Sequence, residues 1–278
     1  MQSKRVLTIQ DISCVGQCSL TVALPIISAC GVEACPIPSA VLSTHTGGFK
    51  GYTFRDLTDD IPAIEAHWKK EGLRFDAIYS GYLGNARQID SVLSLAKNVS
   101  VPGAPLIVDP AMADNGKLYV GFDAAYVECM KKLIGAADII LPNLTEACCL
   151  TDSIYEQVPT REGVSTILRK LSDLGAKAVV LTGIGYEQGK TGVVIFENGQ
   201  ERYYEHRLLP NPCHGTGDIY ASAFVGALMN AHSIFDSAKI AADYTVRCIE
   251  NTADDPSHWY GAKFEGVLGE LIQAVKKA

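Results

Sequence analysis

The segment Gly215-Thr216-Gly217-Asp218 has residue types and a spacing that could bind an anion and activate a hydroxyl group beside it. Glycine lets the backbone turn with its N–H groups converging, and the apolar run from Ile219 to Met229 predicts a helix behind the turn. Free N–H groups at a helix N-terminus bind anions, and a carboxylate in the first turn could act as a base. An acid there also opposes the helix dipole, so the segment alone leaves a catalytic and a structural interpretation open.

Three further segments place polar side chains where apolar strands are expected to end. Asp109 follows a short apolar run and precedes a proline that stops the strand. Asn143 and Glu146 follow another such run, and their spacing puts both on one face of a helix that starts near Asn143. Asp11 ends the first strand-like segment. Helix capping by Asn143, a first-turn acid at Glu146 and a turn at Asp11 are the structural alternatives.

Strand-like and helical segments alternate along the whole chain, which predicts a parallel sheet between two layers of helices. The expected strands are Val6–Gln10, Ala34–Leu42, Asp76–Ser80, Leu106–Asp109, Asp138–Leu141, Ala178–Thr182, Gly192–Glu197 and Glu201–Arg207. The expected helices are Leu20–Cys30, Ile61–Glu71, Ala86–Asn98, Ala124–Gly135, Glu162–Leu174, Asp218–Asn230, Ser237–Glu250 and Phe264–Lys277. The Asn198-Gly199 pair predicts a hairpin, and therefore an antiparallel edge. Ligands of such a sheet bind outside the carboxyl ends of its strands, where the polar segments meet.

The order of these motifs resembles the pyridoxal kinase branch of the ribokinase-like superfamily. The resemblance also rests on Ser43-Thr44-His45-Thr46-Gly47-Gly48 and Ser80-Gly81-Tyr82-Leu83-Gly84, and it covers almost the whole chain. It implies one ribokinase-like kinase domain over residues 1–278, a three-layer α/β/α sandwich with a mostly parallel central sheet and an antiparallel edge. It also implies a homodimer.

The resemblance implies ATP-dependent phosphorylation of the hydroxymethyl group of a B6 vitamer: pyridoxal, pyridoxine or pyridoxamine. Asp218 would be the general base, and the backbone N–H groups of Gly215, Thr216 and Gly217 would form the anion hole. Mg²⁺ would neutralise the triphosphate, and a monovalent cation such as K⁺ is a further candidate. A loose, water-mediated set of Asp109, Asn143 and Glu146 suits Mg²⁺, because this ion keeps several of its own waters.

The other site positions also follow from the resemblance. The vitamin ring would contact Asp11, Thr46, Gly47 and Tyr82, and the nucleotide would contact Asp109, Asn143, Glu146, Thr182 and Gly183. The ordinary alternatives are loop positions for Thr46 and Gly47 and helix packing for Tyr82. The glycine-rich stretch from Thr46 to Gly51 suggests a flap that excludes water on closing. His45 is expected to be a structural, hydrogen-bonding histidine.

One position departs from the family pattern, because the family commonly has serine where this chain has Asp11. A related kinase of hydroxymethylpyrimidine, the thiamin precursor, is therefore the alternative enzyme, since it shares the catalytic motifs and differs mainly around Asp11 and Tyr82. A non-catalytic vitamin-binding protein on the same fold is the third hypothesis. It is disfavoured because every position of catalytic type is occupied.

Composition excludes several other classes of protein. The net charge of −7 with no basic stripe argues against nucleic acid and anionic membranes as partners, and a cytoplasmic location is expected. Gly183 to Lys190 nearly matches an ATP-binding P-loop, but a strand follows it where that motif needs a helix. No dinucleotide-binding glycine pattern follows the first strand. The nine cysteines form no Cys-x-x-Cys pair and are expected to be reduced; Cys213 is the one beside the anion-binding segment.

Overall fold

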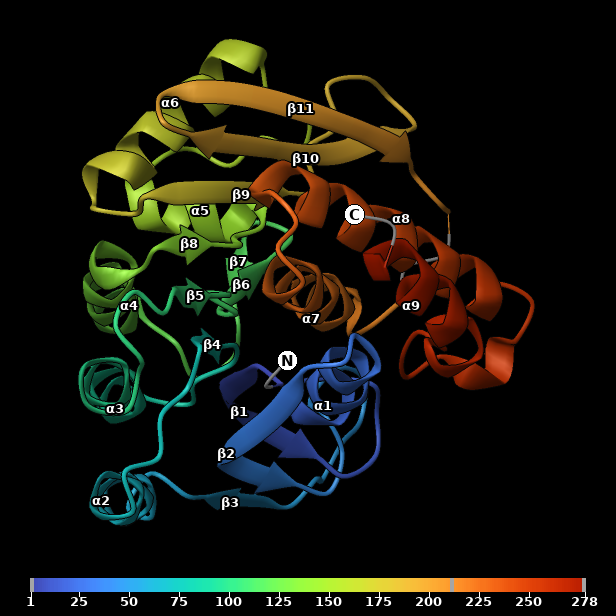
Figure 1. The fold of residues 1–278 in the computed structure, drawn as a ribbon. Helices are drawn as coiled ribbons and strands as arrows, with labels where there is room; N and C mark the ends of the chain where they lie inside the picture. The colour runs from blue at the N-terminus through green and yellow to red at the C-terminus, as the bar shows by residue number, and fades with distance from the viewer. Residues whose placement is uncertain (1–2, 211–212, 277–278) are drawn as a thin grey trace.

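The computed structural model describes residues 3–210 and 213–276, which form a nine-stranded sheet covered by helices on both faces (Figure 1). The strands are β1 (Arg5–Ser13), β2 (Glu33–Leu42), β3 (Phe54–Asp56), β4 (Ala77–Ser80), β5 (Leu106–Val108), β8 (Ile139–Ile140), β9 (Ala178–Thr182), β10 (Lys190–Glu197) and β11 (Gln200–Arg207). A separate small hairpin consists of β6 (Ala113–Asp114) and β7 (Lys117–Leu118). The helices are α1 (Leu20–Ala29), α2 (Ile61–Lys70), α3 (Ala86–Asn98), α4 (Ala124–Ala136), α5 (Leu144–Thr151), α6 (Arg161–Asp173), α7 (Thr216–Met229), α8 (Ile234–Thr252) and α9 (Leu268–Lys276).

The sheet is parallel in its interior and antiparallel at both edges. Its strand order is β11-β10-β9-β8-β5-β4-β1-β2-β3. β1, β2, β4, β5, β8 and β9 pair in parallel, whereas β10 and β11 continue the sheet antiparallel to β9. This confirms the predicted fold class and the predicted hairpin edge. The three-residue strand β3, antiparallel to β2 at the opposite edge, was not expected from the sequence.

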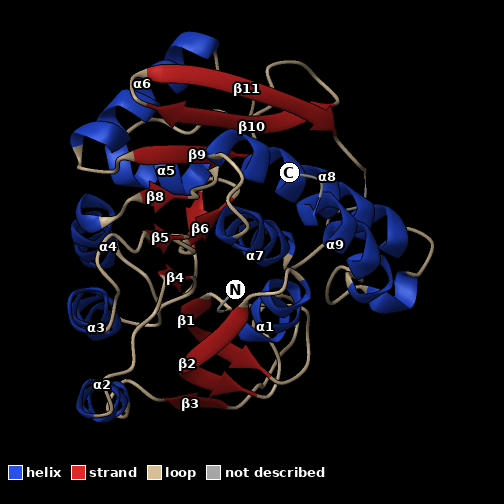
Figure 2. Cartoon of the chain, viewed as in Figure 1, coloured by secondary structure: helices blue, strands red, loops and turns tan. Residues whose placement is uncertain are grey.

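Two layers of helices bury the two faces of the sheet (Figure 2). One core packs the sheet against α2 to α6, and the other packs it against α1, α7, α8 and α9. β1 contributes to both: Leu7 and Ile9 belong to the first core, whereas Val6 belongs to the second. A strand buried on both faces needs an unbroken apolar run, which is why this segment lacks the alternation of a half-exposed strand.

α7 is the central helix of its layer and lies between α1 and α8 (Figure 1). Every residue from Ile219 to Ala227 is buried, because the helix is apolar all round. Its N-terminus follows the long connection from β11. A helix fixed by the core in this way gives its first turn a rigid support.

Most predicted boundaries agree with the structure within a few residues. The last predicted helix is divided into a short 3₁₀ turn, Glu265–Val267, and α9, and its predicted end at Lys277 lies outside the described residues. The helix expected near Asn143 is α5. None of the described helices is long and apolar enough to cross a membrane.

Candidate active site

The predicted anion-binding segment forms the first turn of α7. Gly215 precedes the helix with φ 76°, and Thr216, Gly217 and Asp218 are its first three residues. A Cβ at Gly215 would lie 1.7 Å from the Gln17 carbonyl oxygen, so only glycine fits there. A Cβ at Gly217 would meet nothing within 4 Å. Open space therefore lies beside this first turn, whose N–H groups could bind an anion there.

Asp218 is half-buried in this first turn. Burial raises the pKa of its carboxyl to about 7, and the negative charge of Asp11 adds to the increase. The backbone of Ser19 nearby lowers the pKa of the carboxyl and partly offsets both effects. A carboxyl with a pKa near neutrality can both accept and release a proton under ordinary conditions, which is the property a general base needs.

Asp11 lies near the end of β1 and is only 5% exposed. Burial raises the pKa of its carboxyl, while hydroxyl groups of Ser19 and Ser13 stabilise the ionised form; the Ser13 hydroxyl donates at 3.0 Å. Tyr82 follows β4, and burial together with the Asp11 charge raises the pKa of its hydroxyl to about 12. The structure therefore brings these two predicted ring-binding residues together.

The loop that carries Thr46 and Gly47 is held by an aromatic cluster. His45 is buried, and its Nε2 lies 2.7 Å from the Tyr260 carbonyl oxygen while its Nδ1 accepts from the Gly47 N–H at 3.0 Å. Phe49 packs on Trp259 with ring centroids 4.6 Å apart. These contacts confirm His45 as a hydrogen-bonding histidine, and burial lowers the pKa of its imidazole. Thr46 is exposed at the tip of the loop.

Asp109 and Glu146 form a buried pair of acids. Asp109 follows β5 and Glu146 lies in the first turn of α5; they are 8% and 3% exposed. Burial raises the pKa of each carboxyl well above its usual range, and the charge of Asp218 raises that of Asp109 further, as the charge of Asp109 raises that of Glu146. Such a pair is relieved either by a bound proton or by a nearby cation.

Asn143 and Glu146 form the capping box of α5. The Asn143 carboxamide accepts from the Glu146 N–H at 3.0 Å, and the Glu146 carboxylate accepts from the Asn143 N–H at 2.8 Å and from the Met112 N–H at 3.2 Å. The capping alternative from the sequence is thus present, and it fixes both side chains at the carboxyl edge of the sheet. Thr182 pairs with Asn143 in a single β-bridge, and Gly183 follows it with φ 73°.

These contacts join the predicted residues into one band along the carboxyl ends of the strands. Electrostatic interactions link neighbouring acids in the order Asp11, Asp218, Asp109 and Glu146. The β-bridge between Asn143 and Thr182 extends the band towards the antiparallel edge. The sequence missed Ser19, whose polar groups lower the pKa of Asp11 and of Asp218. It also missed the fully buried Tyr79; burial and the charges of Asp109 and Asp218 raise the pKa of its hydroxyl, and a hydroxyl-bearing residue in an apolar strand was the available signal.

In the described part of the chain, neither Cys213 nor a cluster of metal-binding side chains provides an alternative reactive centre. Burial raises the pKa of the Cys213 thiol, the opposite of what a reactive thiolate needs. Within residues 3–210 and 213–276, no three His, Cys, Asp or Glu side chains are placed to hold a metal ion directly.

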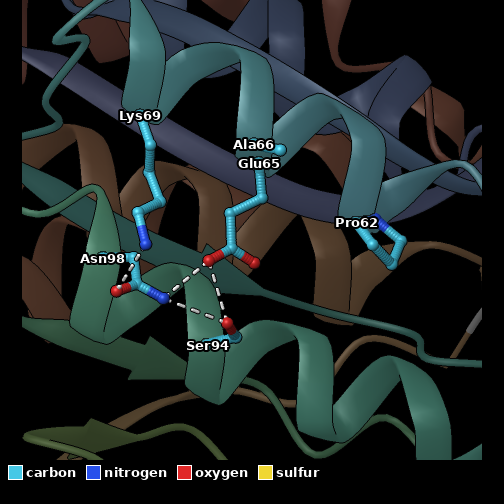
Figure 3. Close-up of a pocket in the computed structure, with 6 residues that line it drawn as sticks. All are labelled: Pro62, Glu65, Ala66, Lys69, Ser94 and Asn98. Carbon is cyan, nitrogen blue, oxygen red and sulfur yellow. Dashed lines mark hydrogen bonds between the residues drawn. The ribbon is translucent and has the colours of Figure 1, made fainter.

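A hollow of about 460 Å³ between α2 and α3 lies apart from this band (Figure 3). Its lining residues are Pro62, Glu65, Ala66, Lys69, Ser94 and Asn98. The Glu65 carboxylate accepts from Ser94 at 2.8 Å and from Asn98 at 2.7 Å. Because these polar groups satisfy one another across the two helices, the hollow is a helix-packing feature and includes none of the predicted site residues.

Comparison with known proteins places this geometry in a family. The family model of phosphomethylpyrimidine kinase matches residues 23–261. A Bacteroides thetaiotaomicron protein assigned as a phosphomethylpyrimidine kinase is 39% identical and superposes with a TM-score of 0.92, covering 98% of this chain and 94% of that one. Its orthorhombic crystal form, 38% identical with a TM-score of 0.91, contains pyridoxal and covers 97% of this chain and 96% of that one.

Two further relatives carry pyridoxal kinase names. The pyridoxal kinase of Lactobacillus plantarum is 30% identical with a TM-score of 0.89, covering 97% of each chain. A pyridoxine/pyridoxal/pyridoxamine kinase of Bordetella bronchiseptica is 27% identical, covering 90% of this chain and 89% of the relative. These findings confirm the resemblance stated from the motifs. The chain belongs to the phosphomethylpyrimidine kinase family and is a ribokinase-like kinase that transfers a phosphoryl group to an alcohol.

Proposed function

We propose that this protein uses ATP to phosphorylate the hydroxymethyl group of a B6 vitamer: pyridoxal, pyridoxine or pyridoxamine. The observation that carries the proposal is Asp218, a half-buried acid with a pKa of about 7 in the first turn of α7, beside a glycine that no other residue can replace. Pyridoxal in the crystals of the Bacteroides relative supports this class of acceptor.

In the proposed reaction, Asp218 accepts the proton of the hydroxymethyl group as its oxygen forms a bond to the γ-phosphorus of ATP. The bond between that phosphorus and the bridging oxygen breaks, and ADP leaves. Backbone N–H groups of Gly215, Thr216 and Gly217 stabilise the charge that develops on the transferred group. Preorganised donors of this kind need no rearrangement during the reaction, because the core holds α7 in place.

Magnesium fits the acids at the centre of the site. Burial and neighbouring negative charge raise the pKa of both Asp109 and Glu146, so a divalent cation nearby would favour the ionised form of both. Both oxygens of Glu146 already accept backbone N–H groups, so its remaining lone pairs suit water ligands of the ion better than the ion itself. With Asn143, these residues would hold the metal, which supplies positive charge to the triphosphate when bound.

The two ends of the band suit the two substrates. Asp11, Tyr82 and the loop with Thr46 and Gly47 would surround the vitamin ring, since these groups lie on the β1 side of Asp218. The nucleotide would lie along Asp109, Asn143, Glu146, Thr182 and Gly183, towards β9. Asp218 lies between the two groups, as a phosphoryl transfer requires.

The alternative acceptor is hydroxymethylpyrimidine. The observation that favours it is the family itself, since the matching model is that of phosphomethylpyrimidine kinase. This alternative keeps the role of Asp218 and changes only the groups around Asp11 and Tyr82.

A substrate panel tests the proposal. Purified protein with ATP and MgCl₂ would be offered pyridoxal, pyridoxine, pyridoxamine and hydroxymethylpyrimidine, and ADP release and phosphorylated product would both be measured. We expect turnover with at least one B6 vitamer and its loss in Asp218→Asn. Faster turnover of hydroxymethylpyrimidine than of every vitamer would establish the alternative, whereas binding without ADP release would leave a non-catalytic vitamin-binding protein.

We also propose that the protein assembles as a homodimer. Val15, Tyr52 and Phe54 are 51%, 39% and 50% exposed beside the edge strand β3, where unpaired backbone groups and apolar side chains together favour association. Light scattering would give the mass of the particle in solution, and a monomer at micromolar concentration would refute this assembly.

A further inference from the structure

The vitamin-binding loop, residues 44–50, is joined to a C-terminal segment, residues 258–261, by His45. This histidine is 5% exposed and lies 215 residues from Tyr260 in the sequence. Its Nδ1 accepts a hydrogen bond from the Gly47 N–H at 3.0 Å, and its Nε2 lies 2.7 Å from the Tyr260 carbonyl oxygen. A carbonyl oxygen can only accept a hydrogen bond, so Nε2 carries the proton and the ring is neutral. One imidazole therefore bonds to the loop on one side and to the C-terminal segment on the other.

Aromatic packing joins the same two segments a second time. The Phe49 and Trp259 rings have centroids 4.6 Å apart, and the His45 ring meets Phe49 edge-on at 5.0 Å. A Cβ at Gly48 would lie 2.8 Å from the Trp259 ring, so the indole lies directly against the backbone of the loop. Trp259 is 51% exposed and belongs to neither hydrophobic core. Its position is therefore explained by the loop and not by burial in the interior.

The C-terminal segment is itself anchored in the fold. Ala262 and Phe264, which follow it, are buried in the core that contains α1, α7, α8 and α9. The Ala262 N–H donates to the His214 carbonyl oxygen at 3.3 Å, immediately before the first turn of α7. A Cβ at Gly47 would lie 2.8 Å from the His214 ring, so the loop also reaches the start of α7. Because the core fixes the segment, the segment can hold the loop.

We propose that the C-terminal segment is a clamp for the vitamin-binding loop, and that His45 and Trp259 are the positioning residues through which it acts. Thr46 and Gly47, the proposed ring-contacting positions, lie between His45 and Phe49, so the two contacts flank them. A loop that is already held in place needs less ordering when the vitamin binds, and every molecule whose loop is out of place lowers the apparent affinity. This inference rests on the proposed binding role of Thr46 and Gly47.

Substitutions at His45 separate a clamp from a purely local role in the loop. His45→Asn places a carboxamide oxygen near the position of Nδ1 and keeps the bond from Gly47, but its side chain is too short to reach the Tyr260 carbonyl oxygen. We expect KM for the preferred B6 vitamer to rise about three- to tenfold, as for one lost hydrogen bond between neutral groups, with little change in kcat or in KM for ATP. His45→Ala loses both bonds and should raise this KM further. A wild-type KM in His45→Asn would show that His45 shapes only its own loop, and would overturn the inference.

Trp259→Ala tests the second contact at an exposed position, where folding is least at risk. It should raise the same KM about three- to tenfold through loss of the aromatic pair, whereas Trp259→Phe, which keeps a ring against Phe49, should stay near the wild type. Trp68→Ala is the matched control, because Trp68 is the other tryptophan of the chain and pairs with Phe75 at 5.1 Å against the opposite core. It should leave KM unchanged. An unchanged KM in Trp259→Ala, or an equal rise in Trp68→Ala, would overturn the inference.

Limited proteolysis tests the clamp without substrate. Lys50 is exposed at the end of the loop, and trypsin cleaves after lysine where the chain opens locally. Cleavage at Lys50, identified by mass spectrometry, should be about three- to tenfold faster in His45→Asn and Trp259→Ala, because its rate follows the fraction of molecules with an open loop. Wild-type cleavage rates in both variants would overturn the inference even in an active enzyme. A wild-type protein that phosphorylates no vitamer would refute the proposed function, while proteolysis still decides on the clamp.

Discussion

Replacement of Asp218 by asparagine should remove activity and at the same time stabilise the protein at alkaline pH. Burial raises the pKa of this carboxyl from its ordinary 3.8 to about 7. The difference corresponds to roughly 4 kcal/mol of unfavourable free energy for the ionised form in the folded state. Because the side chain is only half-buried and solvent screens part of this cost, we expect about 2–4 kcal/mol.

The sign of the effect follows from proton binding. Between about pH 4 and pH 7 the folded protein retains a proton on Asp218 that the unfolded chain has released, so stability falls as the pH rises through this window. Above pH 7 the full cost is present. Asparagine has nearly the same shape and no charge, so the variant should equal the wild type near pH 4 and exceed it at pH 8, by roughly 6–12 °C in melting temperature.

The assay is thermal unfolding of wild type and Asp218→Asn at pH 4 and pH 8, combined with steady-state kinetics. The variant should lose about a hundred- to ten-thousandfold in kcat, and the wild-type kcat/KM should decline as the pH falls below about 7. The difference between the two proteins reports the titration of Asp218 together with its electrostatic coupling to Asp11 and Asp109. A variant that is no more stable at pH 8 than the wild type would refute the electrostatic reasoning.

Three other substitutions test the rest of the site. Glu146→Gln should raise the magnesium concentration needed for half-maximal rate. It should also lower the free energy of unfolding by about 1–3 kcal/mol, because the glutamine amide has one oxygen and cannot accept hydrogen bonds from both backbone N–H groups as the carboxylate does. A rate reduced equally at every magnesium concentration would indicate a capping role alone. Gly215→Ala should abolish activity and destabilise the fold, measured by circular dichroism, because its Cβ would collide with the Gln17 carbonyl oxygen; near-normal turnover would contradict the close packing. Asp11→Ser should lower kcat/KM for pyridoxamine, which carries an additional ammonium group, more than for pyridoxal, by roughly 1.5–3 kcal/mol; an equal loss for all three vitamers would show that Asp11 only supports the backbone of β1.

The order of strands and helices was predictable because each inner strand is an apolar run that ends in a polar residue or proline. The β10–β11 hairpin is the clearest case: Asn198 and Gly199 have φ 53° and 74°, the positive angles that the Asn-Gly pair predicts. β3 was missed because it has three exposed residues and no periodicity, and its pairing with β2 depends on contacts distant in sequence.

The site also contains residues that the sequence predicts and residues that it does not. Acids at strand ends could be located in the sequence, because parallel strands bring their carboxyl ends to one edge. Ser19 could not, since its positive φ accompanies a bridge to Ile12 that only the folded chain forms, and serine gives no local signal for a positive φ. The raised pKa values likewise arise from burial between the helices and the sheet, which only the folded chain creates.

The row of buried acids makes ligand binding a proton-exchange reaction. Burial raises the pKa values of Asp11, Asp109, Glu146 and Asp218, so these groups retain protons at a higher pH than ordinary carboxyls do. A cation that binds beside them favours their ionised forms, and the displaced protons pass to the buffer. The heat of binding therefore includes the enthalpy of buffer protonation, and calorimetry of the same ligand in PIPES and in Tris will give different apparent enthalpies.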